Sequence, residues 1–194
     1  MKNFFLFLTC SLISVAAYGQ SRTNPANQPK ELGKVSWLRD YDAALAESKR
    51  TDKPVLILFQ EVPGCSTCQQ YGNVTLSHPL MVEAIENEFV PLAIYNNKQG
   101  KDAKILARYG EPAWNNPVVR IVDAKGENIV DRVAGNYTPK GLFTAMTLAQ
   151  LATNRTIPGY VEVLGLELAA AERAEEATFQ MYCFWSGEHH LGNH

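Results

Sequence analysis

Two cysteines separated by two residues, Cys65 and Cys68, are the feature of this sequence whose residue types and spacing can do chemistry. They occur in the stretch EVPGCSTCQQ, directly after the apolar run PVLILF. A pair with this spacing can exchange disulfides, form a structural disulfide or supply half of a metal site. The choice among these three depends on the elements that hold the two sulfurs.

The pair is expected to lie between a buried strand and a helix. The continuous apolar run at residues 55–59 predicts a strand buried on both faces, and the sequence after the cysteines predicts a helix. A sulfur at the start of a helix lies beside unpaired backbone N–H groups, which favour the thiolate. A second sulfur one turn later can attack a mixed disulfide formed at the first. We therefore expect Cys65 to attack and Cys68 to resolve.

The elements on either side complete an α/β domain. In chain order the pattern predicts a helix, a strand, the cysteine pair, a helix interrupted near Gly72, a strand, a helix, two strands joined by a turn, and a helix. This order predicts a central mixed β-sheet flanked by helices over residues 35–153. Residues 154–160, NRTIPGY, are interpreted as a linker to a C-terminal appendage at 161–194.

The N-terminus has the composition of a secretory signal peptide. Residues 1–19 carry one positive charge, a short apolar stretch and a small residue at Gly19. An uncleaved membrane anchor would need a longer apolar stretch of roughly 20 residues. We therefore expect export across the inner membrane to the periplasm, where disulfides can form. Residues 20–34 are polar, contain two prolines and are expected to be a flexible leader.

Two alternatives to disulfide exchange remain open at this stage. A permanent disulfide would make the domain a binding module, although a loop of two residues constrains the unfolded chain little. A metal site would need further Cys or His ligands. His78, His189 and His190 are candidates, but no second pair of closely spaced cysteines exists, so we expect neither a metal nor another cofactor. The net charge of −2 makes nucleic acid a poor candidate partner.

The stretch KRTDKPVLILFQEVPGCSTC, followed about fifty residues later by NNPVV, resembles the thioredoxin-like family, particularly its secreted bacterial thiol-disulfide members. The resemblance implies a thioredoxin-like fold and the activity of a thiol-disulfide oxidoreductase on protein thiols or disulfides, supplied by a membrane or periplasmic reductant. It also implies that Pro117, after Asn116, forms a cis peptide bond and positions the substrate chain.

Two positions depart from the family pattern. Many thioredoxins have a tryptophan directly before the first cysteine, where this chain has Gly64. Many also have a buried aspartate in the preceding strand, where the nearest residue here is Phe59. Glu61 is a candidate substitute as proton acceptor. Because redox potential depends on the surroundings of the thiolate, the direction of electron flow stays open.

A separate resemblance concerns the third cysteine that would remain after removal of the signal peptide. The motif around Cys183, Phe184 and Trp185 resembles the opening of an A-type peptide methionine sulfoxide reductase, whose first strand ends in GCFW. The resemblance implies that Cys183 is the nucleophile and that the two aromatic residues enclose the substrate methyl group. Tyr182 replaces the family glycine, and the reductase segment is expected to be incomplete in this chain.

The two resemblances together predict that the cysteine pair donates electrons to a fused or separate methionine sulfoxide reductase. A tethered dithiol would act at a high effective concentration. The alternative is that FQMYCFW is an apolar strand or tail with a buried, inert thiol.

Overall fold

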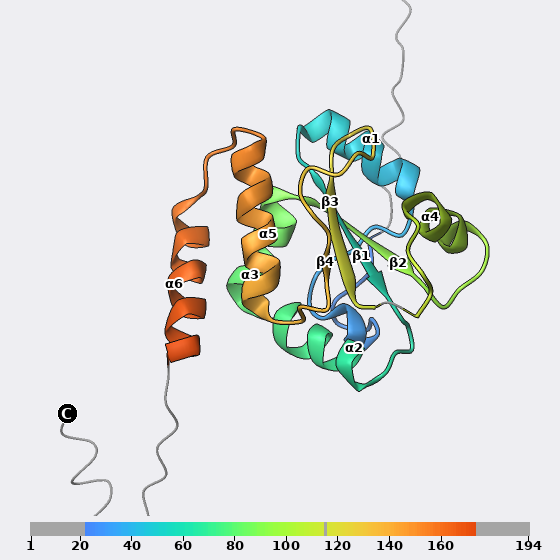
Figure 1. Ribbon diagram of the computed structural model, residues 1–194, viewed down its shortest axis with the longest axis horizontal. Helices are drawn as coiled ribbons and strands as arrows, with labels where there is room; N and C mark the ends of the chain where they lie inside the picture. Colours follow the sequence, from blue (N-terminus) through green and yellow to red (C-terminus); the bar gives the residue numbers. More distant parts are fainter. Residues whose placement is uncertain (1–21, 115, 174–194) are drawn as a thin grey trace, which may run out of the picture.

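The computed structural model describes residues 22–114 and 116–173 (Figure 1). A four-stranded sheet in the order β2-β1-β3-β4 forms its centre. The central strand β1 runs parallel to β2 and antiparallel to β3, which pairs antiparallel with β4. The predicted mixed sheet is therefore confirmed. The strands are β1 (Val55–Gln60), β2 (Val90–Tyr95), β3 (Val118–Val122) and β4 (Val133–Ala134).

In the described part of the chain, six helices and two short helical turns surround the sheet. Within residues 22–114 and 116–173, no helix combines the length and the apolar character needed to cross a membrane. The expected interruption near Gly72 is present as a π-helical turn, η2. The elements are η1 (Lys30–Leu32), α1 (Tyr41–Thr51), α2 (Ser66–Gln70), η2 (Tyr71–Thr75), α3 (Pro79–Glu88), α4 (Lys101–Tyr109), α5 (Pro139–Ala152) and α6 (Gly159–Arg173).

Both faces of the sheet are covered because side chains alternate along the strands. Leu56 and Leu58 of β1 pack with α3, α5 and α6 in one cluster. Ile57 and Phe59 pack with α1 and α4 in a second cluster on the opposite face. In Figure 1, α5 and α6 lie on one side of the sheet and α4 on the other. This explains why β1 reads as a continuous apolar run: every one of its residues is buried.

The N-terminal segment is packed against the domain, so the prediction of a flexible leader at residues 20–34 is wrong for the described residues 22–34. Leu32 is fully buried in the core. Gln28 donates two hydrogen bonds to backbone carbonyls of this segment, and Arg22 forms an ion pair with Glu47 of α1 at 2.6 Å. The sequence did not indicate this because Leu32 is an isolated apolar residue between prolines and polar residues, without a period.

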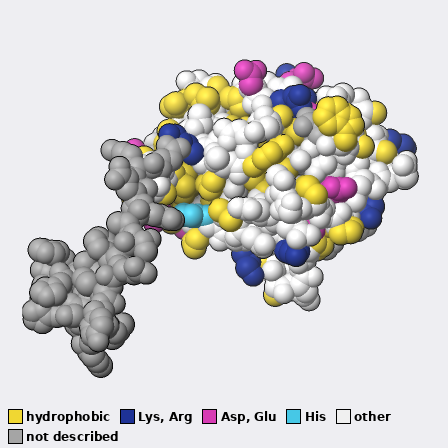
Figure 2. Space-filling view, turned by 60° about the horizontal axis from the view of Figure 1, so that its bottom comes forward, with side chains coloured by type: hydrophobic (Ala, Val, Ile, Leu, Met, Phe, Trp, Pro, Cys, Tyr) yellow, Lys and Arg dark blue, Asp and Glu magenta, His cyan; other side chains and the backbone are white. Residues whose placement is uncertain are grey.

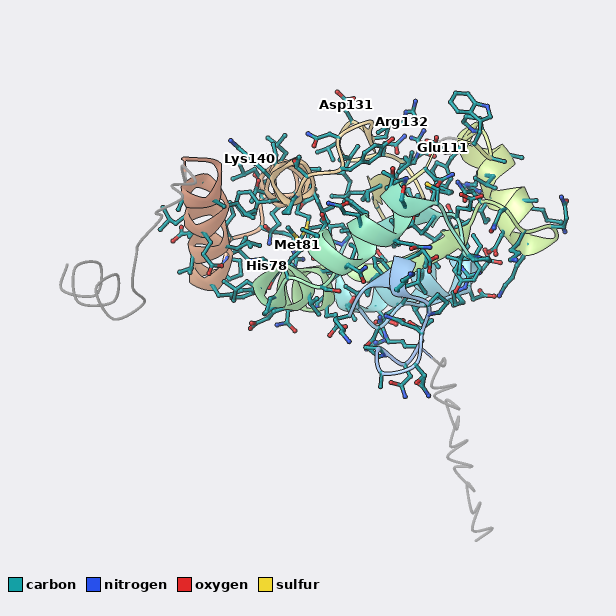
Figure 3. All side chains as sticks on the ribbon, turned by 90° about the horizontal axis from the view of Figure 1, so that it is seen from below. His78, Met81, Glu111, Asp131, Arg132 and Lys140 are labelled. Atoms are coloured by element: carbon teal, nitrogen blue, oxygen red, sulfur yellow. The ribbon has the colours of Figure 1, made fainter. Side chains whose placement is uncertain are left out.

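Helix α6 is part of the same core. It begins at Gly159, inside the predicted linker 154–160, and buries Val161, Leu164 and Leu168. The Nε2 atom of His78, at the start of α3, lies 3.6 Å from Oε2 of Glu167 in α6. Figure 3 shows His78 and the buried Met81 on the side of α3 that faces this helix. The helix predicted beyond the linker therefore covers α3 and α5, while residues 174–194 lie outside the described part of the chain.

Loops at the edge of the sheet are held by charge pairs. The buried carboxylate of Glu111 contacts Arg120 of β3 at 2.6 Å and Arg132 at 2.8 Å. Figure 3 shows Glu111 and Arg132 close together at the same side of the molecule. The turn predicted between the last two strands is present at residues 123–126, where Gly126 has φ 86° and its N–H donates to the carbonyl of Asp123. The two ion pairs of Glu111 fix the loop that begins at this residue and leads into β3.

Candidate active site

Cys65 and Cys68 lie where β1 gives way to α2, as the sequence predicted. Cys65 is the N-cap residue of α2, and Cys68 is in its first turn. The two sulfurs are 3.7 Å apart, so the pair is in the dithiol form. Cys65 is exposed, whereas Cys68 is fully buried. Only Cys65 can therefore meet a sulfur of another molecule without a change in the fold.

The surroundings shift the pKa values of the two thiols in opposite directions. The backbone N–H of Cys68 lowers the pKa of Cys65, against a smaller opposing effect of burial, because N–H donors stabilise the thiolate. Burial and, to a smaller extent, the neighbouring Cys65 sulfur raise the pKa of Cys68 to about 12. The exposed sulfur is thus the better nucleophile, and the buried one holds its proton.

Asn116 and Pro117 face the cysteine pair from the loop before β3. The thiol of Cys68 donates a hydrogen bond to Asn116 Oδ1 at 2.7 Å. The Asn116–Pro117 peptide bond is cis, as the family resemblance implied, and a second cis bond joins Val62 to Pro63. The fold therefore brings together four of the seven site residues predicted from the sequence. Their role in holding a substrate chain stays a prediction.

Glu61 lies beside both sulfurs. One of its carboxylate oxygens and the sulfurs of Cys65 and Cys68 all lie within 4.8 Å of one another. The backbone N–H of Glu61 also hydrogen-bonds the Cys68 sulfur, which opposes the rise in its pKa. The carboxylate is close enough to exchange a proton with Cys68 through one water molecule. Its proximity agrees with the proposed substitution for the absent aspartate, and the role itself stays a prediction.

The glycine before the first cysteine has a steric reason. A Cβ atom at Gly64 would lie 2.6 Å from the Cβ of Cys68 and 2.5 Å from the carbonyl oxygen of Glu61. These separations are shorter than real carbon contacts, so a tryptophan at this position would displace the cysteine loop. The departure from the family pattern therefore follows from how tightly the loop folds over Cys68.

Sequence reasoning missed Glu31, which reaches the same loop from the N-terminal segment. Its side chain is buried, and its Oε1 accepts a hydrogen bond from the backbone N–H of Gly64 at 2.9 Å. The side chain of Gln60, also fully buried, donates to the backbone carbonyls of Glu31 at 2.8 Å and of Cys68 at 3.3 Å. Glu31 is more than thirty residues from the cysteines, and no local pattern could have assigned it to this site.

The surface around Cys65 is weakly charged. A pocket of about 490 Å³ is lined by residues of α2 and η2 on one side and by residues 135–138 on the other, and no ionisable acid or base lines it apart from tyrosines. Trp114, in the loop that leads to Asn116, is 83 % exposed. Figure 2 turns this end of the molecule forward and shows hydrophobic side chains in separate patches among polar and backbone atoms, with charged groups dispersed between them.

The second predicted constellation cannot be placed. Cys183, Phe184 and Trp185 lie outside the described residues, as do the predicted signal peptide at 1–19 and His189 and His190. Of the histidines considered as metal ligands, His78 is described, and its imidazole lies against Glu167 of α6 rather than with the cysteines.

Comparisons with known proteins agree with this geometry. Residues 36–124 match a family model described as Thioredoxin-like. With the mixed sheet and its covering helices, this match shows that the domain has a thioredoxin-like α/β fold. No protein with a curated description matches the chain.

Several solved structures are similar to the chain, including the following three. One is a DsbH oxidoreductase, at 18 % identity and TM-score 0.48, covering 63 % of this chain and 91 % of that one. Another is a thioredoxin from Thermus thermophilus, at 21 % identity and TM-score 0.45, covering 60 % of this chain and 86 % of that one. The third is a disulphide isomerase from Xylella fastidiosa Temecula1, at 25 % identity and TM-score 0.39, covering 64 % of this chain and 86 % of that one.

Proposed function

From a thioredoxin-like fold that brings Cys65 and Cys68 together, we propose that this protein is an exported thiol-disulfide oxidoreductase acting on other proteins. One observation carries the proposal: an exposed sulfur and a buried sulfur lie 3.7 Å apart at the start of α2, with pKa values shifted in opposite directions. This asymmetry is what a two-step exchange requires.

The two steps follow from the positions of the sulfurs. The Cys65 thiolate attacks a partner disulfide, forming a mixed disulfide and releasing one partner thiolate. Cys68 then loses its proton and attacks Cys65, which releases the second partner thiolate and leaves a Cys65–Cys68 disulfide. Asn116 and Pro117, next to Cys68, are proposed to position the partner chain, and Glu61 to accept the Cys68 proton through water.

The accessibility of Cys65 favours this function over a binding module with a permanent disulfide. A structural disulfide has no need for an exposed sulfur or for a thiol pKa lowered by backbone N–H groups. A permanent disulfide would also resist reduction, with a potential below about −300 mV. Measuring the equilibrium with glutathione and thioredoxin as reference couples separates the two functions.

The main test is the reduction of insulin disulfides by the full chain with dithiothreitol as the electron source. We expect wild type to accelerate insulin precipitation and Cys65→Ser to be inactive. Cys68→Ser should accumulate a mixed disulfide with insulin, because the resolving thiol is absent. Cys183→Ser is the matched control and should retain the wild-type rate. Full activity in Cys65→Ser would exclude the assignment of the nucleophile.

The finer proposal is that the dithiol reduces an A-type peptide methionine sulfoxide reductase, fused to it or separate. The resemblance around Cys183, Phe184 and Trp185 supports it, together with the chemical need of such an enzyme for a dithiol after each turnover. A membrane or periplasmic reductant would then recharge the pair.

This donor role can be tested with a separately produced A-type reductase. The reduced chain is mixed with the oxidised form of that enzyme and a methionine sulfoxide peptide, with no other thiol present. We expect one peptide reduced for each Cys65–Cys68 disulfide formed, and none with Cys65→Ser. If the oxidised reductase leaves the chain in its dithiol form, the donor role is excluded, while the insulin assay still decides the general activity.

A further inference from the structure

The cysteine pair and Glu61 form a group of three potential metal ligands. The two sulfurs and one carboxylate oxygen lie within 4.8 Å of one another, so a small rotation of the Glu61 side chain would let a single ion contact all three. The sequence did not suggest this, because a metal site was expected to need a second pair of Cys or His residues. The third ligand is instead a carboxylate at the end of β1.

The distance between the sulfurs fits a tetrahedral ion. Two thiolates bound to one Zn²⁺ at about 2.3 Å each, with a tetrahedral angle between them, lie about 3.75 Å apart. The Cys65 and Cys68 sulfurs are 3.7 Å apart before any ion is considered. A linear two-coordinate ion would require a larger separation of the sulfurs, because it lies directly between them. A tetrahedral ion could therefore bind both sulfurs with almost no movement of α2.

The carboxylate is placed to complete three protein ligands. The backbone N–H of Glu61 hydrogen-bonds the Cys68 sulfur, so the residue is anchored next to that ligand. Because Cys65 is exposed, the fourth position faces solvent and can accept water or a thiolate from another molecule. Sulfur and carboxylate ligands with one open position are a set that Zn²⁺ accepts.

We propose that the dithiol form of this protein binds one Zn²⁺ ion through Cys65, Cys68 and Glu61, and that oxidation of the pair releases it. The site goes beyond the proposed exchange activity, and only the release step depends on that activity. Binding displaces one proton from each thiol. In the release step the zinc-bound dithiolate, one partner disulfide and two protons yield the protein disulfide, free Zn²⁺ and two partner thiols.

The ion and the partner disulfide therefore compete for the same two sulfurs. While zinc is bound, neither thiolate is free to attack, and the exchange rate falls with the fraction of protein that is metal-free. Bound zinc would also protect Cys65, the exposed thiol, from oxidation beyond the disulfide.

Binding is tested with Zn²⁺ and Co²⁺ on the full chain carrying Cys10→Ser and Cys183→Ser, which leaves Cys65 and Cys68 as the remaining cysteines. Zinc is titrated in competition with a chromophoric chelator, and Co²⁺ reports tetrahedral sulfur coordination through its absorption. We expect one ion per reduced chain and none per oxidised chain. Either Cys65→Ser or Cys68→Ser should abolish the sulfur-to-cobalt band typical of two thiolates.

Glu61→Gln tests the third ligand without removing the backbone N–H that contacts Cys68. We expect its zinc affinity to fall by about tenfold or more, since even residues outside the ligand set alter affinity by that factor. Glu162→Gln, an exposed carboxylate on α6, is the matched control and should bind like wild type. Equal affinity of Glu61→Gln and wild type, or one ion shared by two chains, would overturn the proposal.

Insulin reduction by the metal-free protein separates this proposal from the proposed function. Insulin reduction without zinc binding overturns the metal site and leaves the oxidoreductase. Zinc binding without insulin reduction supports the site and excludes the oxidoreductase. When both are present, added zinc should lower the insulin reduction rate of wild type, relative to its own zinc-free rate, at concentrations that change the rate of Glu61→Gln much less relative to the zinc-free rate of that variant.

Discussion

The carboxylate of Glu31 accepts a hydrogen bond from the backbone N–H of Gly64, the residue directly before Cys65, at 2.9 Å. Glu31 belongs to the turn η1 in the N-terminal segment, before the residues that match the thioredoxin-like family model. The backbone carbonyl of the same residue accepts from buried Gln60, which also donates to the carbonyl of Cys68. The N-terminal segment is thus attached to the cysteine loop at two points.

Replacing Glu31 should disturb both stability and the reactive sulfur. Glu31→Ala removes a hydrogen bond to a carboxylate, and we expect a loss of about 1.5–3 kcal/mol in the free energy of unfolding. Glu31→Gln keeps an acceptor oxygen and should lose less. Urea unfolding measures the stability. The rate of Cys65 alkylation reports the conformation of the cysteine loop, and we expect this rate to differ between Glu31→Ala and wild type.

Glu86→Ala is the control for this prediction. Glu86 also holds the N-terminal segment, through the backbone N–H of Ser36 at 2.7 Å, but it lies on α3 away from the cysteines. It should lower stability without changing Cys65 alkylation. If Glu31→Ala and Glu86→Ala alter the alkylation rate equally, Glu31 acts only by holding the segment in place.

The pH dependence of Cys65 alkylation follows from its lowered pKa. The rate of reaction with iodoacetamide should rise with pH and reach half of its maximum below pH 9.0, the ordinary pKa of a cysteine thiol. Cys68 should remain unmodified in this range, because burial raises its pKa to about 12 and shields it from the reagent. Mass spectrometry of the folded, reduced chain with Cys10→Ser and Cys183→Ser should show one alkyl group. A half-maximal rate at or above pH 9.0 would contradict the lowered pKa.

The raised pKa of Cys68 also predicts how stability changes in alkali. Between pH 9.0 and about 12 this thiol ionises in the unfolded chain and stays protonated in the folded one. The contribution of the Cys68 thiol to the free energy of unfolding is therefore complete below pH 9.0 and is lost as pH rises through that window. Burial of Tyr71 raises its pKa too, but equally in both redox states. We expect urea unfolding to show a steeper alkaline loss for the reduced protein than for the disulfide form, and parallel curves would contradict this.

Local patterns predicted most of the fold. The buried run at residues 55–59 became β1, one residue longer. Thr138 caps α5, with Pro139 as its first residue, and Gly110 ends α4 in the left-handed conformation. These features were readable because each depends on a few adjacent residues. The start of α6 was missed because NRTIPGY has the composition of a linker, although Val161, Leu164 and Leu168 follow at helical spacing.

The site was predicted less completely, because part of it is created by tertiary packing. Cys65 and Cys68 could be assigned from their spacing, and Pro117 from the resemblance to a family. The contact between Glu31 and Gly64 depends on how a segment without periodicity folds back, which no local signal encodes. The need for glycine at position 64 likewise appears only when Cys68 is seen beneath it.

Asn116 should tune the reduction potential. Its Oδ1 accepts a hydrogen bond from the Cys68 thiol, a bond that the disulfide form lacks. Asn116→Ala removes about 0.5–1.5 kcal/mol of stabilisation from the reduced form alone, which shifts the potential by about 10–30 mV in the negative direction. Redox equilibration with glutathione measures the shift. Asn128→Ala removes an amide that contacts Arg120, away from the cysteines, and should leave the potential unchanged. A positive shift in Asn116→Ala would mean that the amide stabilises the disulfide instead.

Trp114 is expected to act in partner binding rather than in folding. It is 83 % exposed, so Trp114→Ala should change the free energy of unfolding by less than about 0.5 kcal/mol. Because it projects from the loop that leads to Asn116, a protein docked over Cys65 can bury its ring, whereas a small disulfide cannot. Insulin reduction should therefore slow, mainly through a higher KM, while reduction of a small aromatic disulfide continues at the wild-type rate. Leu166→Ala removes another exposed apolar side chain, on α6, and should affect neither reaction. An equal loss with both substrates in Trp114→Ala would indicate that the ring supports the active-site loop, and not the partner.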